Sequence, residues 1–322
     1  MTLLKIENLS VELATSQGAA RAVSNLSFTL NKGEILGVAG ESGSGKTMTA
    51  LSLMRLLPHK GKASGSLVFN GRDLLALSNK EYCDIRGNEI AMVFQDPMTS
   101  LHPMLNIDTQ ITEHIRHHKK ISHEAARLKA LELLGKVKIP DPASALHALP
   151  RQFSGGMRQR IAIAIALACD PKILIADEPT TALDVTVQAG ILKLLDELRK
   201  ENNLAVMVIT HDLGVLSSIT NKLMIMYAGS EVESGITSDV LKHPKHPYTK
   251  GLIAALPSSN IGGKILQTIE GMPPELGRKP DGCSFAPRCS HAQAFCSQSL
   301  PTKVQISAEH RIFCSVNPWG AQ

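Results

Sequence analysis

The sequence GESGSGKT at residues 40–47 limits the possible folds of this chain more than any other segment. It matches the pattern G-x-x-x-x-G-K-[ST], and it lies between the apolar run EILGVAG and the helix-like stretch MTALSLMRLL. Glycines here let backbone N–H groups turn inward around phosphate oxygens, and the amino end of the following helix adds a favourable dipole. The segment therefore predicts a strand–loop–helix unit that binds nucleotide phosphates, rather than a Gly/Ser-rich turn without a ligand.

Two side chains of this loop carry specific chemistry. Lys46 supplies a positive charge to the β- and γ-phosphates, and the Thr47 hydroxyl is a ligand for Mg²⁺. The residues expected to contact the nucleotide are Gly40, Glu41, Ser42, Gly43, Ser44, Gly45, Lys46, Thr47 and Met48.

A pair of carboxylates follows the apolar run at residues 173–176. Asp177 and Glu178 stand at the carboxyl end of this predicted strand, where ligands bind in open α/β sheets. We expect Asp177 to orient Mg²⁺ through water and Glu178 to act as the general base for the attacking water. An Asp-Glu pair alone is typical of a solvated turn, but its combination with the loop at residues 40–47 favours the catalytic interpretation.

The distribution of apolar residues predicts an α/β protein with a parallel core, an antiparallel edge and an inserted helical subdomain. The start of the chain alternates apolar and polar residues, as antiparallel strands do. The runs KILIAD and AVMVIT are continuously apolar, which is typical of parallel strands buried on both faces. We expect a nucleotide-binding domain over residues 1–255, a helical subdomain at about 97–160, and a small Cys-rich extension over residues 256–322.

Composition excludes several classes of function. Aromatic residues make up 3% of the chain, too few for a module that stacks nucleic-acid bases, so no nucleic-acid partner is expected. The longest apolar runs are far shorter than the roughly 20 residues of a transmembrane helix. No secretory signal is visible at the amino end. We expect a cytoplasmic protein whose membrane role comes through a partner.

A third segment, FSGGM at residues 153–157, opens an apolar helix with exposed N–H donors and a hydroxyl. With it, the ordered set of motifs resembles the nucleotide-binding subunit of an ABC transporter. The segments EPTTALDVTVQ and HPKHPYTKGL are similar to the sequences of the ATPase subunits of oligopeptide, dipeptide and nickel importers. The D-type subunit of these importers is the most similar. The matching segments are the Walker A at 40–47, the Q-loop residue Gln95, the signature at 153–157, the Walker B at 173–179, the D-loop with Asp184, and the switch residue His211.

The resemblance implies a mechanism and a set of partners. Two such domains close head-to-tail around two ATP molecules, so that Ser154, Gly155 and Gly156 of one face Lys46 and Thr47 of the other. His211 is implied to stabilise the γ-phosphate, Gln95 to contact Mg²⁺ together with Thr47 and Asp177, and Asp184 to couple the two sites. The implied partners are two membrane permease subunits, a second ABC ATPase subunit forming a heterodimer, and an extracytoplasmic solute-binding protein. The implied location is the cytoplasmic face of the cell membrane.

Four cysteines crowd the end of the chain with the spacing C-x5-C-x6-C-x17-C: Cys283, Cys289, Cys296 and Cys314. In a reducing compartment such a group favours a metal site over disulfides. Four thiolates suit zinc or a [4Fe–4S] cluster, and free structural thiols are the simpler alternative. The segment GCSFAPRC resembles the tail of the peptide importer ATPases, which implies the iron–sulfur cluster. His310 is expected to be a solvent-exposed residue rather than a ligand.

Other functions are compatible with parts of this pattern. A soluble ABC ATPase acting on DNA or ribosomes usually has coiled-coil or zinc insertions or two cassettes, and no long heptad run is present here. A P-loop kinase needs neither FSGGM nor His211. Import of a chelated metal such as nickel stays open beside import of peptides.

No aromatic residue precedes Phe28, so Leu13 or Arg21 is expected at the adenine in place of the aromatic ring that is usual in ABC domains.

Overall fold

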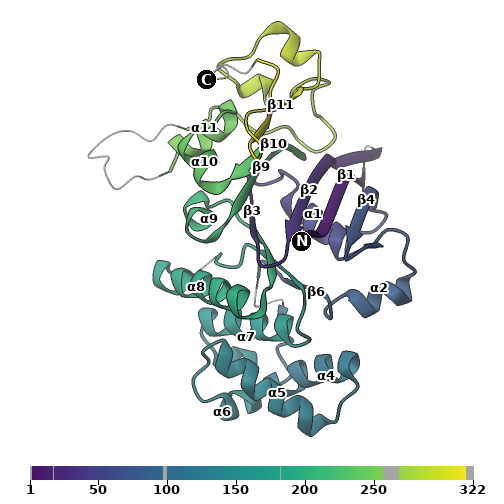
Figure 1. Ribbon diagram of the computed structural model, residues 1–322, viewed down its shortest axis with the longest axis vertical. Coiled ribbons are helices and arrows are strands. Elements are labelled where there is room, and N and C mark those ends of the chain that lie inside the picture. The colour runs from purple at the N-terminus through teal and green to yellow at the C-terminus, as the bar shows by residue number, and fades with distance from the viewer. Residues whose placement is uncertain (1, 17, 97–99, 182, 257–267, 317–322) are drawn as a thin grey trace. The chain divides into compact units, whose positions relative to one another are not determined.

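The computed structural model describes residues 2–16, 18–96, 100–181, 183–256 and 268–316 (Figure 1). The chain divides into two compact units. One unit comprises residues 1–3, 30–34 and 76–209, and the other comprises residues 4–29, 35–75 and 210–322. Each unit is described by itself below. No helix in the described part of the chain is both long enough and apolar enough to cross a membrane.

The unit that contains the Gly-rich loop is built on strands. One sheet has the order β2-β1-β4-β5, and β4 is antiparallel to both β1 and β5. A second group of strands runs β11-β12-β10-β9-β3, in which β3 and β9 are parallel and the other neighbours antiparallel. Helices α10 and α11 pack on β10, and α9 packs on β3 (Figure 1). The strands are β1 (Thr2–Thr15), β2 (Gly18–Asn31), β3 (Ile35–Ala39), β4 (Lys62–Phe69), β5 (Arg72–Asp73), β9 (Lys222–Tyr227), β10 (Ser230–Ile236), β11 (Lys303–Gln305) and β12 (Arg311–Phe313); the helices are α1 (Lys46–Leu53), α9 (Leu213–Ile219), α10 (Thr237–Lys242), α11 (Pro247–Ala254) and the short 3₁₀ turns η2 (Ala286–Arg288) and η3 (Ala294–Ser297).

The other unit combines a parallel sheet with helices. Strands β6, β7 and β8 are adjacent and parallel, and every residue of each is buried, as their continuous apolar runs predict. Helix α7 packs on β6, α4 and α5 pack on α7, and α6 packs on α4 and α5. The elements are α2 (Asn79–Ile85), β6 (Ile90–Val93), α4 (Ile107–Lys119), α5 (His123–Lys136), α6 (Pro142–His147), η1 (Pro150–Gln152), α7 (Gly155–Leu167), β7 (Ile173–Asp177), α8 (Val185–Asn202) and β8 (Ala205–Ile209).

Polar residues at the amino ends of these helices explain where they begin. Asn106, Ser122 and Ser154 each accept a hydrogen bond from a backbone N–H in the first turn of α4, α5 and α7. Such caps satisfy donors that have no partner within the helix. The α/β class predicted from the sequence is confirmed, while the predicted domain boundary at residues 255 and 256 stays a prediction.

The last part of the chain is attached to a sheet. Strand β12 pairs with β10, where Ile312 lies opposite Glu233. Beside it, His310 is 4% exposed, and its Nε2 lies 2.7 Å from the Glu233 carboxylate. The expectation that His310 is a solvent-exposed residue is therefore wrong. A histidine flanked by polar residues reads as exposed in sequence, and only the pairing of β12 with β10 brings a buried carboxylate to it.

Candidate functional site

The loop at residues 40–47 joins the buried strand β3 to helix α1. Gly45 precedes the first residue of α1 with φ of 95°, a conformation that favours glycine. A Cβ at Gly45 would also lie 2.8 Å from the carbonyl oxygen of Ala22. The loop therefore requires glycine at this position for both backbone conformation and space, as the strand–loop–helix prediction assumed.

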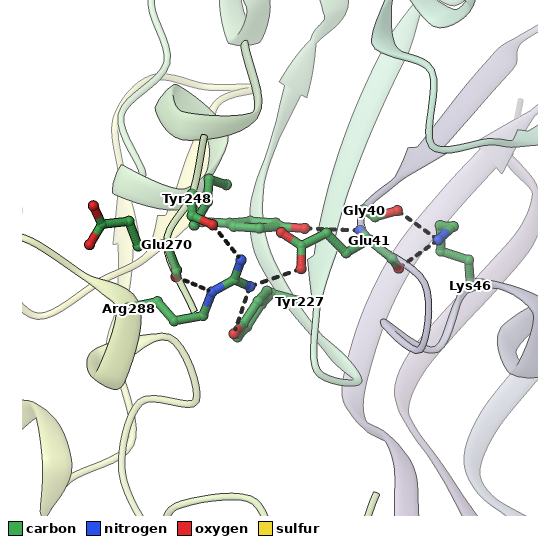
Figure 2. Close-up of polar contacts among 8 residues, drawn as sticks. Gly40, Glu41, Lys46, Tyr227, Tyr248, Glu270 and Arg288 are labelled. Atoms are coloured by element: carbon green, nitrogen blue, oxygen red, sulfur yellow. Dashed lines mark hydrogen bonds and ion pairs between the residues drawn. The ribbon is translucent and has the colours of Figure 1, made fainter. Parts of the chain in front are cut away.

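The side chain of Lys46 is held inside this loop. Lys46 is 6% exposed, and its Nζ donates hydrogen bonds to the carbonyl oxygens of Gly40 at 2.7 Å and Glu41 at 2.9 Å (Figure 2). Ser44 is also buried, whereas Ser42 and Gly43 are exposed. A buried ammonium next to exposed backbone N–H groups is suited to an anionic ligand.

Residues far along the chain contact the same loop. The Tyr248 hydroxyl accepts a hydrogen bond from the Glu41 N–H at 2.9 Å, and the Arg288 guanidinium pairs with the Glu41 carboxylate at 2.8 Å (Figure 2). Burial raises the pKa of Tyr248, so the hydroxyl stays neutral at physiological pH. The sequence analysis did not identify Tyr248 or Arg288 as site residues. The available signal was their place in HPYTKGL and GCSFAPRC, the two segments that resemble peptide importers.

In the other unit, the predicted catalytic side chains of Gln95 and Glu178 are in contact. Glu178 follows β7, and its Oε2 accepts hydrogen bonds from Gln95 Nε2 at 3.0 Å and from Thr181 Oγ1 at 2.8 Å. Asp177, the last residue of β7, is 2% exposed. Glu178 has φ of 46°, an uncommon conformation for a residue with a side chain that is often found at functional sites. The positive φ at Glu178 turns the backbone directly after Asp177, the last residue of β7.

The FSGGM segment forms the start of α7. The Ser154 hydroxyl accepts a hydrogen bond from the Met157 N–H at 3.3 Å. A Cβ at Gly156 would lie 2.4 Å from Cγ1 of Val187, so any larger residue there would force the Val187 side chain to move. Gly155 and Gly156 thus leave the amino end of the helix uncovered by side chains of their own. Asp184 is exposed and caps α8 by accepting a hydrogen bond from the Val187 N–H at 2.9 Å.

The predicted switch residue His211 is exposed, and it directly follows a residue that is hydrogen-bonded to β3. The preceding Thr210 donates its N–H to the carbonyl oxygen of Val38, which belongs to β3. Asp212 then caps α9 through the N–H groups of Gly214 and Val215. His211 therefore lies between Thr210, which is hydrogen-bonded to β3, and Asp212, which caps α9. Arg21, expected at the adenine, pairs with Glu12 at 3.2 Å on the exposed β1–β2 surface.

The four terminal cysteines line one cavity of about 20 Å³ together with His246, Phe285 and His291. All six cysteines of the chain are free thiols, and burial raises the pKa of Cys283 and Cys289. Across the part of the chain that the structure describes, no group of three or more His, Cys, Asp or Glu side chains is arranged to hold a metal ion. The four thiols share a cavity, but they do not form a ready set of metal ligands.

Comparisons with known proteins match both parts of this pattern. A family model described as "ABC transporter" matches residues 23–181, and one described as "Oligopeptide/dipeptide transporter, C-terminal region" matches residues 232–296. The chain is 46% identical to the dipeptide transport ATP-binding protein DppD of Bacillus subtilis, over 97% of this chain and 94% of the relative. It is 49% identical to the oligopeptide transport ATP-binding protein OppD of Salmonella typhimurium, over 93% of this chain and 89% of the relative. Among solved structures, the dimeric ATP-binding cassette MJ0796 bound to ADP and Pi matches with a TM-score of 0.65 and 28% identity, over 73% of this chain and 99% of that one.

Proposed function

This chain belongs to the ATP-binding subunits of the oligopeptide and dipeptide ABC transporters, and from that premise we propose that its ATP hydrolysis drives the uptake of di- and oligopeptides. The observation that carries the substrate class is the match of residues 232–296 to the C-terminal region of peptide transporters. The relatives named for peptide transport cover nearly the whole chain and support the same class.

The loop at residues 40–47 binds the phosphates of ATP in this proposal. Its exposed N–H groups and the Lys46 ammonium neutralise the phosphate oxygens, and Met48 completes the contact at the start of α1. Thr47, Gln95 and Asp177 would hold Mg²⁺, which neutralises phosphate charge and orients the γ-phosphate for attack.

Glu178 acts as the general base. Its carboxylate takes a proton from the attacking water, while the Gln95 amide, which donates to Glu178 at 3.0 Å, orients that carboxylate. His211 stabilises charge on the γ-phosphate. The hydrogen bond between Gln95 and Glu178 supports this assignment, because it joins the Q-loop residue directly to the base.

A second ATPase subunit completes each nucleotide site. The amino end of α7, where Ser154 is followed by Gly155 and Gly156 without side chains, suits the γ-phosphate of a nucleotide held by the partner. The exposed Asp184 couples the two sites. The dimeric state of the similar MJ0796 cassette supports such a pairing, and we propose a paralogous subunit as the partner.

The remaining partners are two permease subunits in the membrane and an extracytoplasmic solute-binding protein, with this chain on the cytoplasmic face of the membrane. Uptake into vesicles that contain the purified four-subunit importer and its binding protein tests the substrate class. We expect ATP-dependent accumulation of a labelled dipeptide or pentapeptide. Accumulation of a labelled nickel chelate without any peptide would establish the metal-import alternative, and failure to co-purify with any membrane protein would favour a soluble ATPase.

We also propose that Cys283, Cys289, Cys296 and Cys314 hold a metal centre in the extension. The shared cavity supports this assignment, as does the chemistry of four thiolates, which suits a [4Fe–4S] cluster or zinc. Because the described thiols are not arranged as ligands, the residues around the cavity would have to shift on binding. When bound, the centre would cross-link the parts of the chain that carry the four cysteines.

Anaerobic purification with metal analysis and an optical spectrum distinguishes the alternatives. We expect iron near four per chain and a broad absorption band at about 400 nm, both lost when Cys289 and Cys296 are replaced by Ser. Zinc near one per chain in a colourless sample would replace the cluster with a structural ion. Absence of both metals from the anaerobic protein would show that the cysteines are free structural thiols. Cys83→Ser is the matched control, because Cys83 is exposed and lies outside the extension.

A further inference from the structure

The side chain of Arg288 is buried, and one of its hydrogen-bond partners is Glu41 of the nucleotide loop. The side chain is 6% exposed, and Nη1 donates to the Glu41 carboxylate at 2.8 Å and to the Tyr227 hydroxyl at 3.3 Å (Figure 2). Nε donates to the carbonyl oxygen of Glu270 at 2.9 Å, and Nη2 to that of Ile269 at 3.2 Å. Arginine is rarely buried unless it is paired, and here the only carboxylate among these partners is Glu41.

Glu41 places a negative charge in a loop that binds anions. It is the second residue of the phosphate-binding segment, and its own carbonyl oxygen accepts a hydrogen bond from Lys46 at 2.9 Å. Its carboxylate is 25% exposed, so solvent screens that charge only in part. An unpaired carboxylate here would repel phosphates and compete for the Lys46 ammonium. The guanidinium of Arg288, 2.8 Å from this carboxylate, neutralises its charge and so reduces the repulsion of the phosphates.

The same loop residue is also held through its backbone. The Glu41 N–H donates to the Tyr248 hydroxyl at 2.9 Å, so this donor is already satisfied within the protein. The Tyr248 ring packs on Tyr227 with centroids 4.6 Å apart and on Phe285 at 5.3 Å. Phe285 lies three residues before Arg288, so one aromatic cluster supports both contacts. The loop is thus fixed at the side chain and at the backbone of one residue.

From these contacts we propose that Arg288 is a positioning residue of the ATP site: it neutralises Glu41 and holds the phosphate-binding loop ready for nucleotide. Arg288 itself does not touch the reacting atoms. It acts from the segment that carries the cysteines, since Cys289 is the next residue. The extension is therefore a part of the nucleotide site and not only an appendage of the ATPase domain.

Nucleotide binding to the purified full-length chain tests this role. For Arg288→Gln we expect the Kd for ATP to rise about tenfold, which corresponds to about 1.4 kcal/mol. Because the effect is charge repulsion, the loss is expected to be larger for ATP than for ADP and to shrink when the salt is raised from about 0.05 M to about 0.5 M. Arg288→Lys, which keeps the charge, is expected to recover most of the affinity.

The double variant Glu41→Gln with Arg288→Gln provides the decisive comparison. Removing both charges leaves no carboxylate to repel the phosphates, so its Kd for ATP should return to within about threefold of the wild-type value. If the double variant binds ATP as weakly as Arg288→Gln, or if ATP and ADP lose equal affinity, Arg288 has only a structural role and the proposal is overturned.

Two measurements separate this result from general damage. Arg278→Gln is the matched control, because Arg278 lies in the same extension and forms an exposed pair with Glu275 at 2.9 Å. Its Kd for ATP should equal that of the wild type. If Arg288→Gln fails to fold, as thermal denaturation would show, Arg288→Lys and the double variant still decide the question, because one keeps the charge and the other removes its partner.

Discussion

Replacing Glu178 with Gln is expected to lower kcat for ATP hydrolysis by at least about 100-fold while ATP binding is retained. Loss of a positioned general base removes roughly two to four orders of magnitude from the rate. Gln has nearly the shape of Glu and can still contact Gln95 and Thr181, whose side chains donate to Glu178. The variant should therefore hold ATP without turning it over and accumulate as a closed dimer. ATP turnover by the assembled importer, together with gel filtration in ATP, measures both effects.

A surface glutamate supplies the control for this variant. Glu197 pairs with Lys138 on an exposed face, and Glu197→Gln should leave turnover unchanged. Wild-type turnover in Glu178→Gln would remove the proposed base, and the reaction would then need another group to accept the proton.

Replacing Lys46 with Ala is expected to raise the Kd for ATP by at least about 100-fold. The ammonium is the one buried cation of the loop among its described residues, and hydrogen bonds from a charged donor contribute about 1.5–3 kcal/mol each. Its loss also leaves the carbonyl oxygens of Gly40 and Glu41 without the donor that they share. Equilibrium titration with a fluorescent ATP analogue measures the change.

Lys200→Ala is the matched control for Lys46→Ala, because Lys200 is exposed and its pair with Asp196 lies on the surface of α8. Its affinity for ATP should match that of the wild type. An unchanged affinity in Lys46→Ala would mean that the phosphates are held elsewhere, and the assignment of residues 40–47 would fail.

Local patterns predicted the elements of the site better than its contacts. The loop at residues 40–47 could be recognised because one strand, one loop and one helix follow each other in sequence, and β3 and α1 lie where the pattern places them. Helix α1 ends at Leu53 and is shorter than the apolar stretch indicated, because the chain turns at Arg55 with φ of 48°.

Contacts between distant residues depend on packing that no single segment encodes. Gln95 and Glu178 are 83 positions apart, and their contact follows from the parallel pairing of β6 with β7. Glu41 and Arg288 are 247 positions apart, and no spacing rule links them. The exposure of His310 was predicted wrongly for the same reason, since its partner Glu233 belongs to another strand. Chemistry carried by consecutive residues is therefore predictable from sequence, whereas the groups that tune it have to be found in the structure.

The measurement that tests the central claim most directly records ATP hydrolysis and peptide uptake in the same vesicles. The vesicles contain the purified importer with this chain as one of its ATPase subunits, and the solute-binding protein is added from outside. We predict that peptide-loaded binding protein stimulates ATP turnover, that labelled peptide accumulates in proportion, and that Glu178→Gln abolishes both. Peptide accumulation that persists in Glu178→Gln, or ATP turnover that no peptide affects, would contradict the claim that ATP hydrolysis by this chain drives peptide import.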